Sequence, residues 1–133
     1  MTVHWCGAGL SAIPGLRRLI KNGYEVVVWN RTVDKANAAV GDITSNIRVF
    51  DKGLLQDCLE ENDIIVSMLP ADWHVPLASL AIVKKTHFVS SSYIAPEMRI
   101  LDSEFKKANR VCINEVGLDP GIDHLMAHKL ISD

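Results

Sequence analysis

Residues 3 to 14, VHWCGAGLSAIP, decide how this chain folds. An apolar run ends at Gly7 and Gly9, and a helical pattern with Ala12 and Pro14 near its start follows at once. The spacing matches G-x-G-x-x-A, in which the first glycine turns the chain and the second lets a pyrophosphate approach the backbone. The third small residue lets the helix pack close to the strand. The stretch therefore predicts a nucleotide site at the first strand-to-helix turn.

The rest of the chain repeats this alternation of apolar runs and helical patterns. We expect strands at 2–6, 24–30, 46–50, 63–69, 87–92 and 110–116, and helices at 9–23, 32–40, 52–62, 71–85 and 95–109. Strands separated by helices form a parallel sheet covered on both faces. Right-handed crossovers then give a doubly wound α/β fold of the Rossmann type, with six strands in the order 3-2-1-4-5-6.

Composition excludes several classes of protein. The 133 residues are 48% hydrophobic and 23% charged with a formal net charge of −2, which is typical of one globular domain. Without a basic block or a long apolar run, we expect no nucleic-acid partner and no membrane span. No secretory leader is visible, so we expect a cytoplasmic protein. The spacing of Cys6, Cys58 and Cys112 fits no zinc motif, so we expect reduced thiols and no metal site.

The residues that end the second strand indicate which nucleotide is bound. An NAD site usually carries an acid there, which binds the ribose 2′-hydroxyl. This chain has Asn30, Arg31 and Thr32 instead. An arginine pairs with a 2′-phosphate and stacks on adenine, whereas an acid would repel the phosphate. We therefore predict NADP; an exposed loop arginine, or S-adenosylmethionine on the same glycine loop, are the alternatives.

Residues after the later strands face the same crevice. Leu69 and Pro70 are expected to line the wall near the nicotinamide. Asp119 could orient a substrate ammonium or move a proton, although an aspartate there could equally cap a turn. Tyr93 could donate to a substrate carboxylate or serve as an acid, or it could have a packing role. His124 and His128 are four residues apart, but the sequence offers no third metal ligand.

Five stretches together resemble the saccharopine dehydrogenase family, in its glutamate-forming branch. They are GAGL (7–10), NRT (30–32), SMLPADWHVPLASLAI (67–82), SSSYIAPEMRILD (90–102) and CINEVGLDPGIDHLMA (112–127). The segment NEVGLDPGIDH (114–124) is the most specific of these, and the resemblance covers essentially the whole chain. One departure is Trp73, where a smaller residue is expected.

The resemblance implies a domain organisation and a reaction. Residues 1–117 would be an NADP-binding domain, and residues 118–133 would begin a larger domain that is missing here and supplies most of the substrate site. NADPH would deliver hydride to the imine formed from 2-aminoadipate semialdehyde and L-glutamate, which gives saccharopine. In the reverse direction saccharopine would be the amino-acid substrate, and both directions belong to lysine metabolism. We expect the isolated chain to bind NADP(H) weakly and to catalyse little.

The resemblance also implies roles for individual residues. Phosphate contacts would come from Ala8, Gly9, Leu10 and Ser11, beside the turn at Gly7, and contacts to the 2′-phosphate end from Asn30, Arg31 and Thr32. Substrate would meet Ser92 and Tyr93, and the reactive end of the cofactor would meet Leu118, Asp119 and Pro120. Asp119 and Tyr93 are the candidate catalytic residues.

Two other functions remain open at this point. The chain could belong to a related imine reductase, such as a carboxynorspermidine dehydrogenase, although GLDPGIDH (117–124) argues against it. It could also be a non-catalytic module that senses NADP(H) or docks a partner. A further helix is expected to begin within residues 121–133. Its exposed apolar residues are expected to favour self-association as a homodimer: Leu125, Met126, Leu130 and Ile131.

Overall fold

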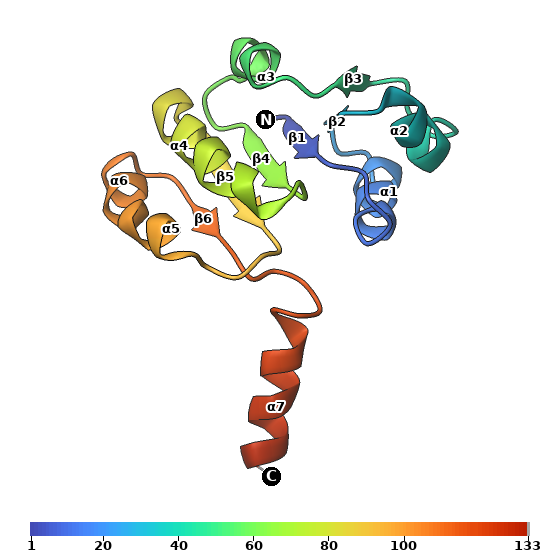
Figure 1. Ribbon diagram of the computed structural model, residues 1–133. Helices are drawn as coiled ribbons and strands as arrows, with labels where there is room; N and C mark the ends of the chain where they lie inside the picture. Colours follow the sequence, from blue (N-terminus) through green and yellow to red (C-terminus); the bar gives the residue numbers. More distant parts are fainter. Residues whose placement is uncertain (133) are drawn as a thin grey trace.

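A parallel sheet of six strands forms the centre of the molecule (Figure 1). The computed structural model describes residues 1–132, and the strand order is β3-β2-β1-β4-β5-β6, which confirms the predicted topology. The strands are β1 (Val3–Cys6), β2 (Val26–Asn30), β3 (Ile47–Val49), β4 (Ile64–Ser67), β5 (His87–Ser90) and β6 (Cys112–Ile113). The helices are α1 (Ile13–Lys21), α2 (Val33–Val40), α3 (Lys52–Cys58), α4 (His74–Lys84), α5 (Pro96–Ile100), α6 (Asp102–Lys107) and α7 (Ile122–Ser132), with a 3₁₀ turn at Ala71–Trp73.

The two faces of the sheet carry two separate hydrophobic cores. Successive side chains of a strand point to opposite faces. In β2, Val26 and Val28 therefore pack in one core with residues of α1 and α2, and Val27 and Trp29 pack in the other with residues of α3, α4, α5 and α6. The central strands β1 and β2 are buried on both sides, as their continuous apolar runs predict, whereas the edge strands β3 and β6 are partly exposed.

Most elements are shorter than expected, and three of the differences change how the chain is divided. The first helix begins at Ile13 rather than at residue 9, because residues 9–12 make the turn that crosses from the sheet to the helix layer. The helix expected at 95–109 is divided into α5 and α6 at Leu101. The edge strand β6 has two residues, since it pairs with β5 alone and the chain leaves the sheet at a left-handed Glu115 (φ +61°).

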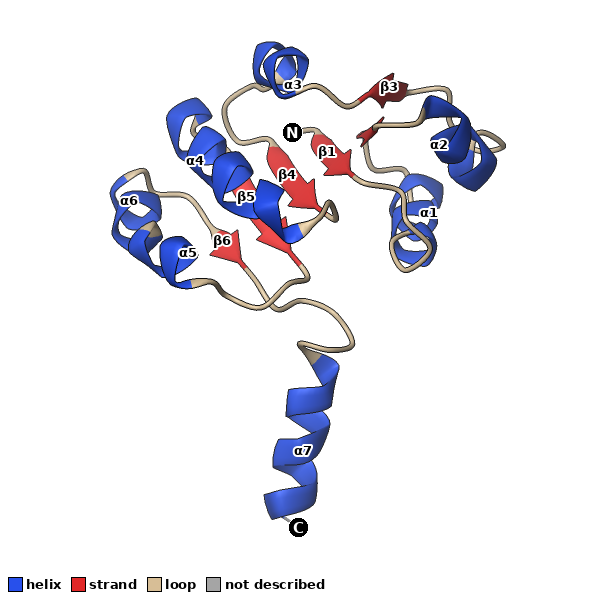
Figure 2. Cartoon of the chain, in the orientation of Figure 1, coloured by secondary structure: helices blue, strands red, loops and turns tan. Residues whose placement is uncertain are grey.

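One part of the sheet has no helix over it in the described chain. The helices α1 and α2 cover β1 to β3, while over β4 and β5 the same face carries Val66 and Val89 at the wall of a hollow. The last helix, α7, leads away from the sheet (Figure 2). Its apolar side chains are exposed, including Leu130 at 76% and Ile131 at 84%. Within residues 1–132, no helix is both long and apolar enough to span a membrane.

Candidate functional site

The glycine loop joins β1 to α1 at the carboxyl edge of the sheet. Gly7 has a φ of +102°, and a Cβ atom there would lie 2.6 Å from the carbonyl oxygen of Met68. Packing between β1 and the end of β4 therefore requires a glycine at this position. Gly9 differs, because a Cβ atom there would meet nothing within 4 Å. The fold explains Gly7, but the space at Gly9 fits a ligand that comes close to the backbone.

Asn30 holds the glycine loop and the next loop in one frame. Its Oδ1 accepts a hydrogen bond from the backbone N–H of Ala8 (3.2 Å), and its Nδ2 donates to the carbonyl oxygen of Thr32 (2.8 Å). The amide is thus occupied within the protein. Asn30 shapes the site by joining the two loops, a role that the sequence analysis did not assign to it.

A small hollow of about 220 Å³ is lined by these two loops and by the loop after β4. It brings together predicted cofactor residues from three loops and adds Met68 and one residue that the sequence analysis missed, Lys35. The predicted residues in its lining are Gly7, Ala8, Gly9, Asn30, Arg31, Thr32, Leu69 and Pro70. Leu69 and Pro70, expected near the nicotinamide, therefore line the same hollow as Arg31 and do not line the large hollow. The lining contains two cations, Arg31 and Lys35, and no carboxylate. The small hollow is therefore suited to an anion.

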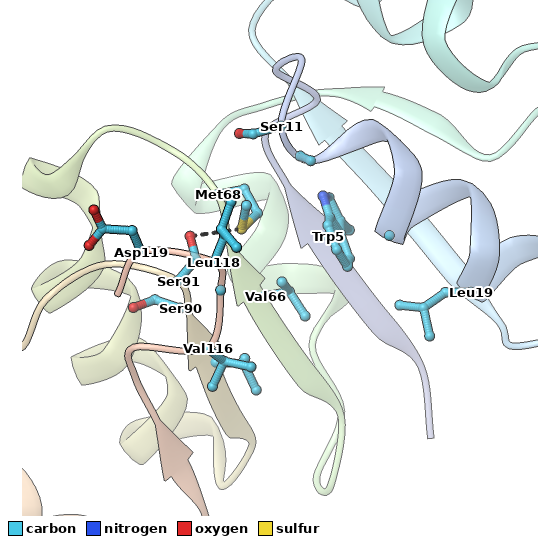
Figure 3. A pocket seen from close by; sticks show the side chains of 14 residues that line it. Trp5, Ser11, Leu19, Val66, Met68, Ser90, Ser91, Val116, Leu118 and Asp119 are labelled. Atoms are coloured by element: carbon cyan, nitrogen blue, oxygen red, sulfur yellow. Dashed lines mark hydrogen bonds between the residues drawn. The ribbon is translucent and has the colours of Figure 1, made fainter. Parts of the chain in front are cut away.

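A large hollow of about 540 Å³ adjoins the start of α1 on the other side of the loop (Figure 3). Trp5, Val66 and Val89 form its apolar floor, and Ser11, Leu118 and Asp119 lie among its lining residues. Ser91 donates a hydrogen bond to the sulfur of Met68 (3.3 Å) at its wall. An apolar floor with a few polar groups at its edge is typical of a small-molecule site.

Tyr93 and Asp119, the two candidate catalytic residues, lie together. The Tyr93 hydroxyl donates to Oδ1 of Asp119 at 2.6 Å, although the residues are 26 positions apart. This hydrogen bond to a carboxylate, with smaller contributions from desolvation and nearby charges, raises the pKa of Tyr93 to about 12. The phenol therefore stays protonated at neutral pH and can act as a donor.

Ser92 is held by a buried histidine that the sequence analysis did not single out. His74 Nε2 lies 2.7 Å from Ser92 Oγ, and its Nδ1 lies 2.8 Å from Ser67 Oγ. Burial lowers the pKa of His74, so the ring is neutral at pH 7. A neutral imidazole has one donor and one acceptor, so one hydroxyl donates to the ring and the other accepts from it.

Four predicted site residues, Leu10, Ser92, Tyr93 and Pro120, line neither hollow. Leu10 is 90% exposed, and Pro120 is buried after a cis Asp119–Pro120 peptide bond. Trp73, the departure from the family pattern, packs edge-on against Phe50 at 5.0 Å between ring centres. Among residues 1–132, no group of three or more metal-ligating side chains comes together. The predicted contacts of Leu10 and Pro120 stay predictions.

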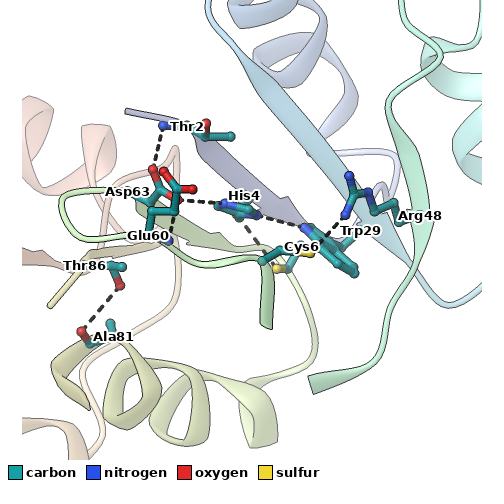
Figure 4. A network of polar contacts seen from close by, with 10 residues as sticks. Thr2, His4, Cys6, Trp29, Arg48, Glu60, Asp63, Ala81 and Thr86 are labelled. Atoms are coloured by element: carbon teal, nitrogen blue, oxygen red, sulfur yellow. Dashed lines mark hydrogen bonds and ion pairs between the residues drawn. The ribbon is translucent and has the colours of Figure 1, made fainter. Parts of the chain in front are cut away.

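A second polar network is buried beneath the strands, from Asp63 before β4 to Trp29 in β2 (Figure 4). Trp29 Nε1 donates to His4 Nδ1 (3.2 Å), so His4 Nε2 carries the proton that is donated to Asp63 Oδ2 (3.1 Å). Asp63 also accepts from the backbone N–H groups of Thr2 and Glu60. Burial lowers the pKa of His4 despite the raising effect of Asp63. For Asp63, these donors outweigh burial and hold its pKa below the usual value.

Comparisons with known proteins agree with this geometry. The family model described as the saccharopine dehydrogenase NADP binding domain matches residues 3–113. Saccharopine dehydrogenase [NADP(+), L-glutamate-forming] of Saccharomyces cerevisiae is 39% identical over 131 residues, which is 96% of this chain and 29% of that protein. An α-aminoadipic semialdehyde synthase of Arabidopsis thaliana is 34% identical over 117 residues, 85% of this chain and 11% of that protein.

A solved structure of a relative has the same fold as this chain. The apo saccharopine dehydrogenase (L-Glu forming) from Saccharomyces cerevisiae superimposes with a TM-score of 0.84 at 37% sequence identity. The match covers 98% of this chain and 30% of that one. This chain therefore spans less than a third of the length of these relatives.

Proposed function

This chain belongs to the saccharopine dehydrogenase family through its NADP-binding domain, and from that premise we propose that it holds NADP(H) for hydride transfer to the imine that becomes saccharopine. The observation that carries the proposal is the glycine loop: a turn that needs Gly7, then open space at Gly9 beside two hollows. One hollow suits the phosphorylated adenosine end, and the other suits the nicotinamide end.

The residues present fit NADP by their chemistry. The pyrophosphate would lie over Ala8 and Gly9, in the turn that precedes α1, and the positive amino end of that helix favours an anion. Arg31 would pair with the 2′-phosphate through its planar guanidinium. Ser11, Leu118 and Asp119 would surround the reactive end, since they line the large hollow. When bound, NADPH supplies the hydride that reduces the imine carbon.

Tyr93 and Asp119 would act at the substrate end of the same crevice. The hydroxyl of Tyr93 is protonated and donates a hydrogen bond to Asp119. A substrate carboxylate that replaces Asp119 as the acceptor, or a substrate ammonium that pairs with Asp119, would use this pair without any change in fold. Ser92, fixed by His74, would add a second hydroxyl beside it. These groups orient the substrate and manage protons.

The substrate site would be completed by a further domain, which is consistent with the greater length of the relatives. We place the domain boundary at residues 117 and 118, so that α7 belongs to the start of that domain. Two features support this: the exposed apolar side chains of α7 and the uncovered sheet face at Val66 and Val89. The cytoplasmic location and self-association of the chain stay predictions.

The experiment is a pair of titrations of this chain. NADPH and NADH are titrated by fluorescence or calorimetry into wild-type and Arg31→Ala protein, and L-glutamate is then titrated into the NADP⁺-loaded ¹⁵N-labelled chain. We expect NADPH to bind more tightly than NADH, with the preference reduced in Arg31→Ala. We expect L-glutamate to shift the amide signals of Ser92 and Tyr93 more than those of α3, which lies on the other side of the molecule.

Two results would contradict the proposal at different points. Equal affinity for the two cofactors would remove the NADP site. A clear NADPH preference without any shift at Ser92 and Tyr93 would leave the cofactor site intact and remove the substrate assignment.

A further inference from the structure

The lining of the small hollow contains one cation more than the motif accounts for. Arg31 follows β2 directly, and Lys35 lies four residues later in the first turn of α2. Both side chains are exposed, and within residues 1–132 neither forms an ion pair with an acid. Two unpaired cations therefore lie beside one hollow.

The position of Lys35 is unfavourable by local physics. The amino end of a helix carries partial positive charge, so a lysine in the first turn is repelled by the helix dipole. Arg31 adds a second repulsion across the same turn. Departures from local rules of this kind are often found at functional sites. Asp34 in the same turn offsets part of this repulsion, and an anion in the small hollow would attract both cations.

The charge of the ligand matches two cations better than one. A phosphate monoester carries about two negative charges at neutral pH. Arg31 can take two of its oxygens with the planar guanidinium, whereas a lysine acts as a mobile point charge that can reach a third. No carboxylate lines the small hollow to compete for either cation.

We propose that Lys35 is a second specificity-determining residue for NADP, which pairs with the 2′-phosphate together with Arg31. This inference rests on the proposed function, because it needs the adenosine end of the cofactor in the small hollow. It predicts that the preference for NADPH is divided between two residues. It also predicts that Arg31→Ala alone leaves a residual preference.

The test compares the affinities for NADPH and NADH in four variants: Lys35→Gln, Lys35→Glu, Arg31→Ala and Lys21→Gln. Lys21→Gln is the matched control, since it makes the same change in charge in the last turn of α1, at the far end from the glycine loop. We expect Lys35→Gln to weaken NADPH binding about three- to tenfold at low ionic strength, with NADH unchanged. Lys35→Glu should weaken NADPH further, and added salt should reduce the difference between Lys35→Gln and wild type.

Each outcome decides between the two claims. If the wild type prefers NADPH and Arg31→Ala reduces the preference, but both Lys35 variants bind like the control, then Arg31 acts alone and the inference is wrong. If Lys35→Gln weakens both cofactors equally, Lys35 does not read the 2′-phosphate and the inference is again wrong. A wild type without preference would instead overturn the proposed NADP site itself.

Discussion

Two polar networks of the sheet have opposite character. His4, Asp63 and Trp29 are buried beneath the strands, and their polar atoms are paired with one another or with the backbone. At the carboxyl edge, Arg31 and Lys35 are exposed cations that form no ion pair within residues 1–132, beside a glycine with empty space above it. The closed network, His4, Asp63 and Trp29, has its polar atoms paired within the protein and so stabilises the fold. Arg31 and Lys35 have charges that are free to pair with a ligand. The difference teaches that unsatisfied polarity, more than polarity itself, marks the site.

Asp63→Ala is expected to show the largest effect. It leaves His4 and two backbone N–H groups without their acceptor, and buried groups left in this way cost about 3 kcal/mol in total. Urea denaturation should show the loss of unfolding free energy. The control is Asp42→Ala, which breaks an exposed pair with Arg17 and should cost far less. Equal losses in the two variants would mean that the closed network has no special stabilising role.

The two glycines of the loop provide the next comparison. Gly7→Ala forces a methyl group against the Met68 carbonyl at an unfavourable φ and should lower the unfolding free energy by about 2 kcal/mol. Gly9→Ala should leave stability nearly unchanged and weaken NADPH binding about tenfold or more, because the methyl group occupies the space for the pyrophosphate. Denaturation and cofactor titration of both variants separate the effects. Normal NADPH binding by Gly9→Ala would contradict the assigned position of the pyrophosphate.

Stability should fall as pH decreases from about 7 to about 5. Burial lowers the pKa of both His4 and His74, so in this range the unfolded chain binds protons that the folded chain does not. Proton binding therefore favours unfolding. Urea midpoints measured across this range should fall with pH, and the slope should be smaller in His74→Gln. A pH-independent midpoint would mean that both rings protonate freely in the folded protein.

The smallest expected effect concerns the titration of Tyr93. Its pKa of about 12 depends first on the hydrogen bond to Asp119. Asp119→Asn should move this pKa back towards the usual value of a tyrosine, near 10. Ultraviolet titration of phenolate formation measures it, in a Tyr24→Phe background that removes the other tyrosine. An unchanged titration in Asp119→Asn would show that the pair does not form in solution.

The sheet order, and the meeting of the glycine loop with the loop after β2 at one hollow, could be predicted from the sequence. Strand runs such as 63–69 and the glycine spacing at Gly7 are local sequence signals, so they can be recognised without the tertiary structure. The pairing of Tyr93 with Asp119 could not be predicted, because two loops 26 residues apart meet only once β5 and β6 are neighbours.

Three other assignments needed the structure for different reasons. Lys35 looks like an ordinary helix-surface lysine until the small hollow is seen. His74 resembles a helix-start residue until both of its ring nitrogens are found bonded to serines. Asn30 could be placed at the site from the sequence, but its use as a link between two loops depends on its exact hydrogen bonds.

The frame made by Asn30 separates the shape of the site from its charge. The neutral amide of Asn30 joins the two loops by hydrogen bonds. Arg31 and Lys35, the cations that line the small hollow, take no part in these hydrogen bonds. If Arg31 and Lys35 read the 2′-phosphate as proposed, cofactor preference can be redesigned at these two residues while the loop geometry is retained. Two surface substitutions would then exchange one nicotinamide cofactor for the other, with the sheet and the glycine turn unchanged.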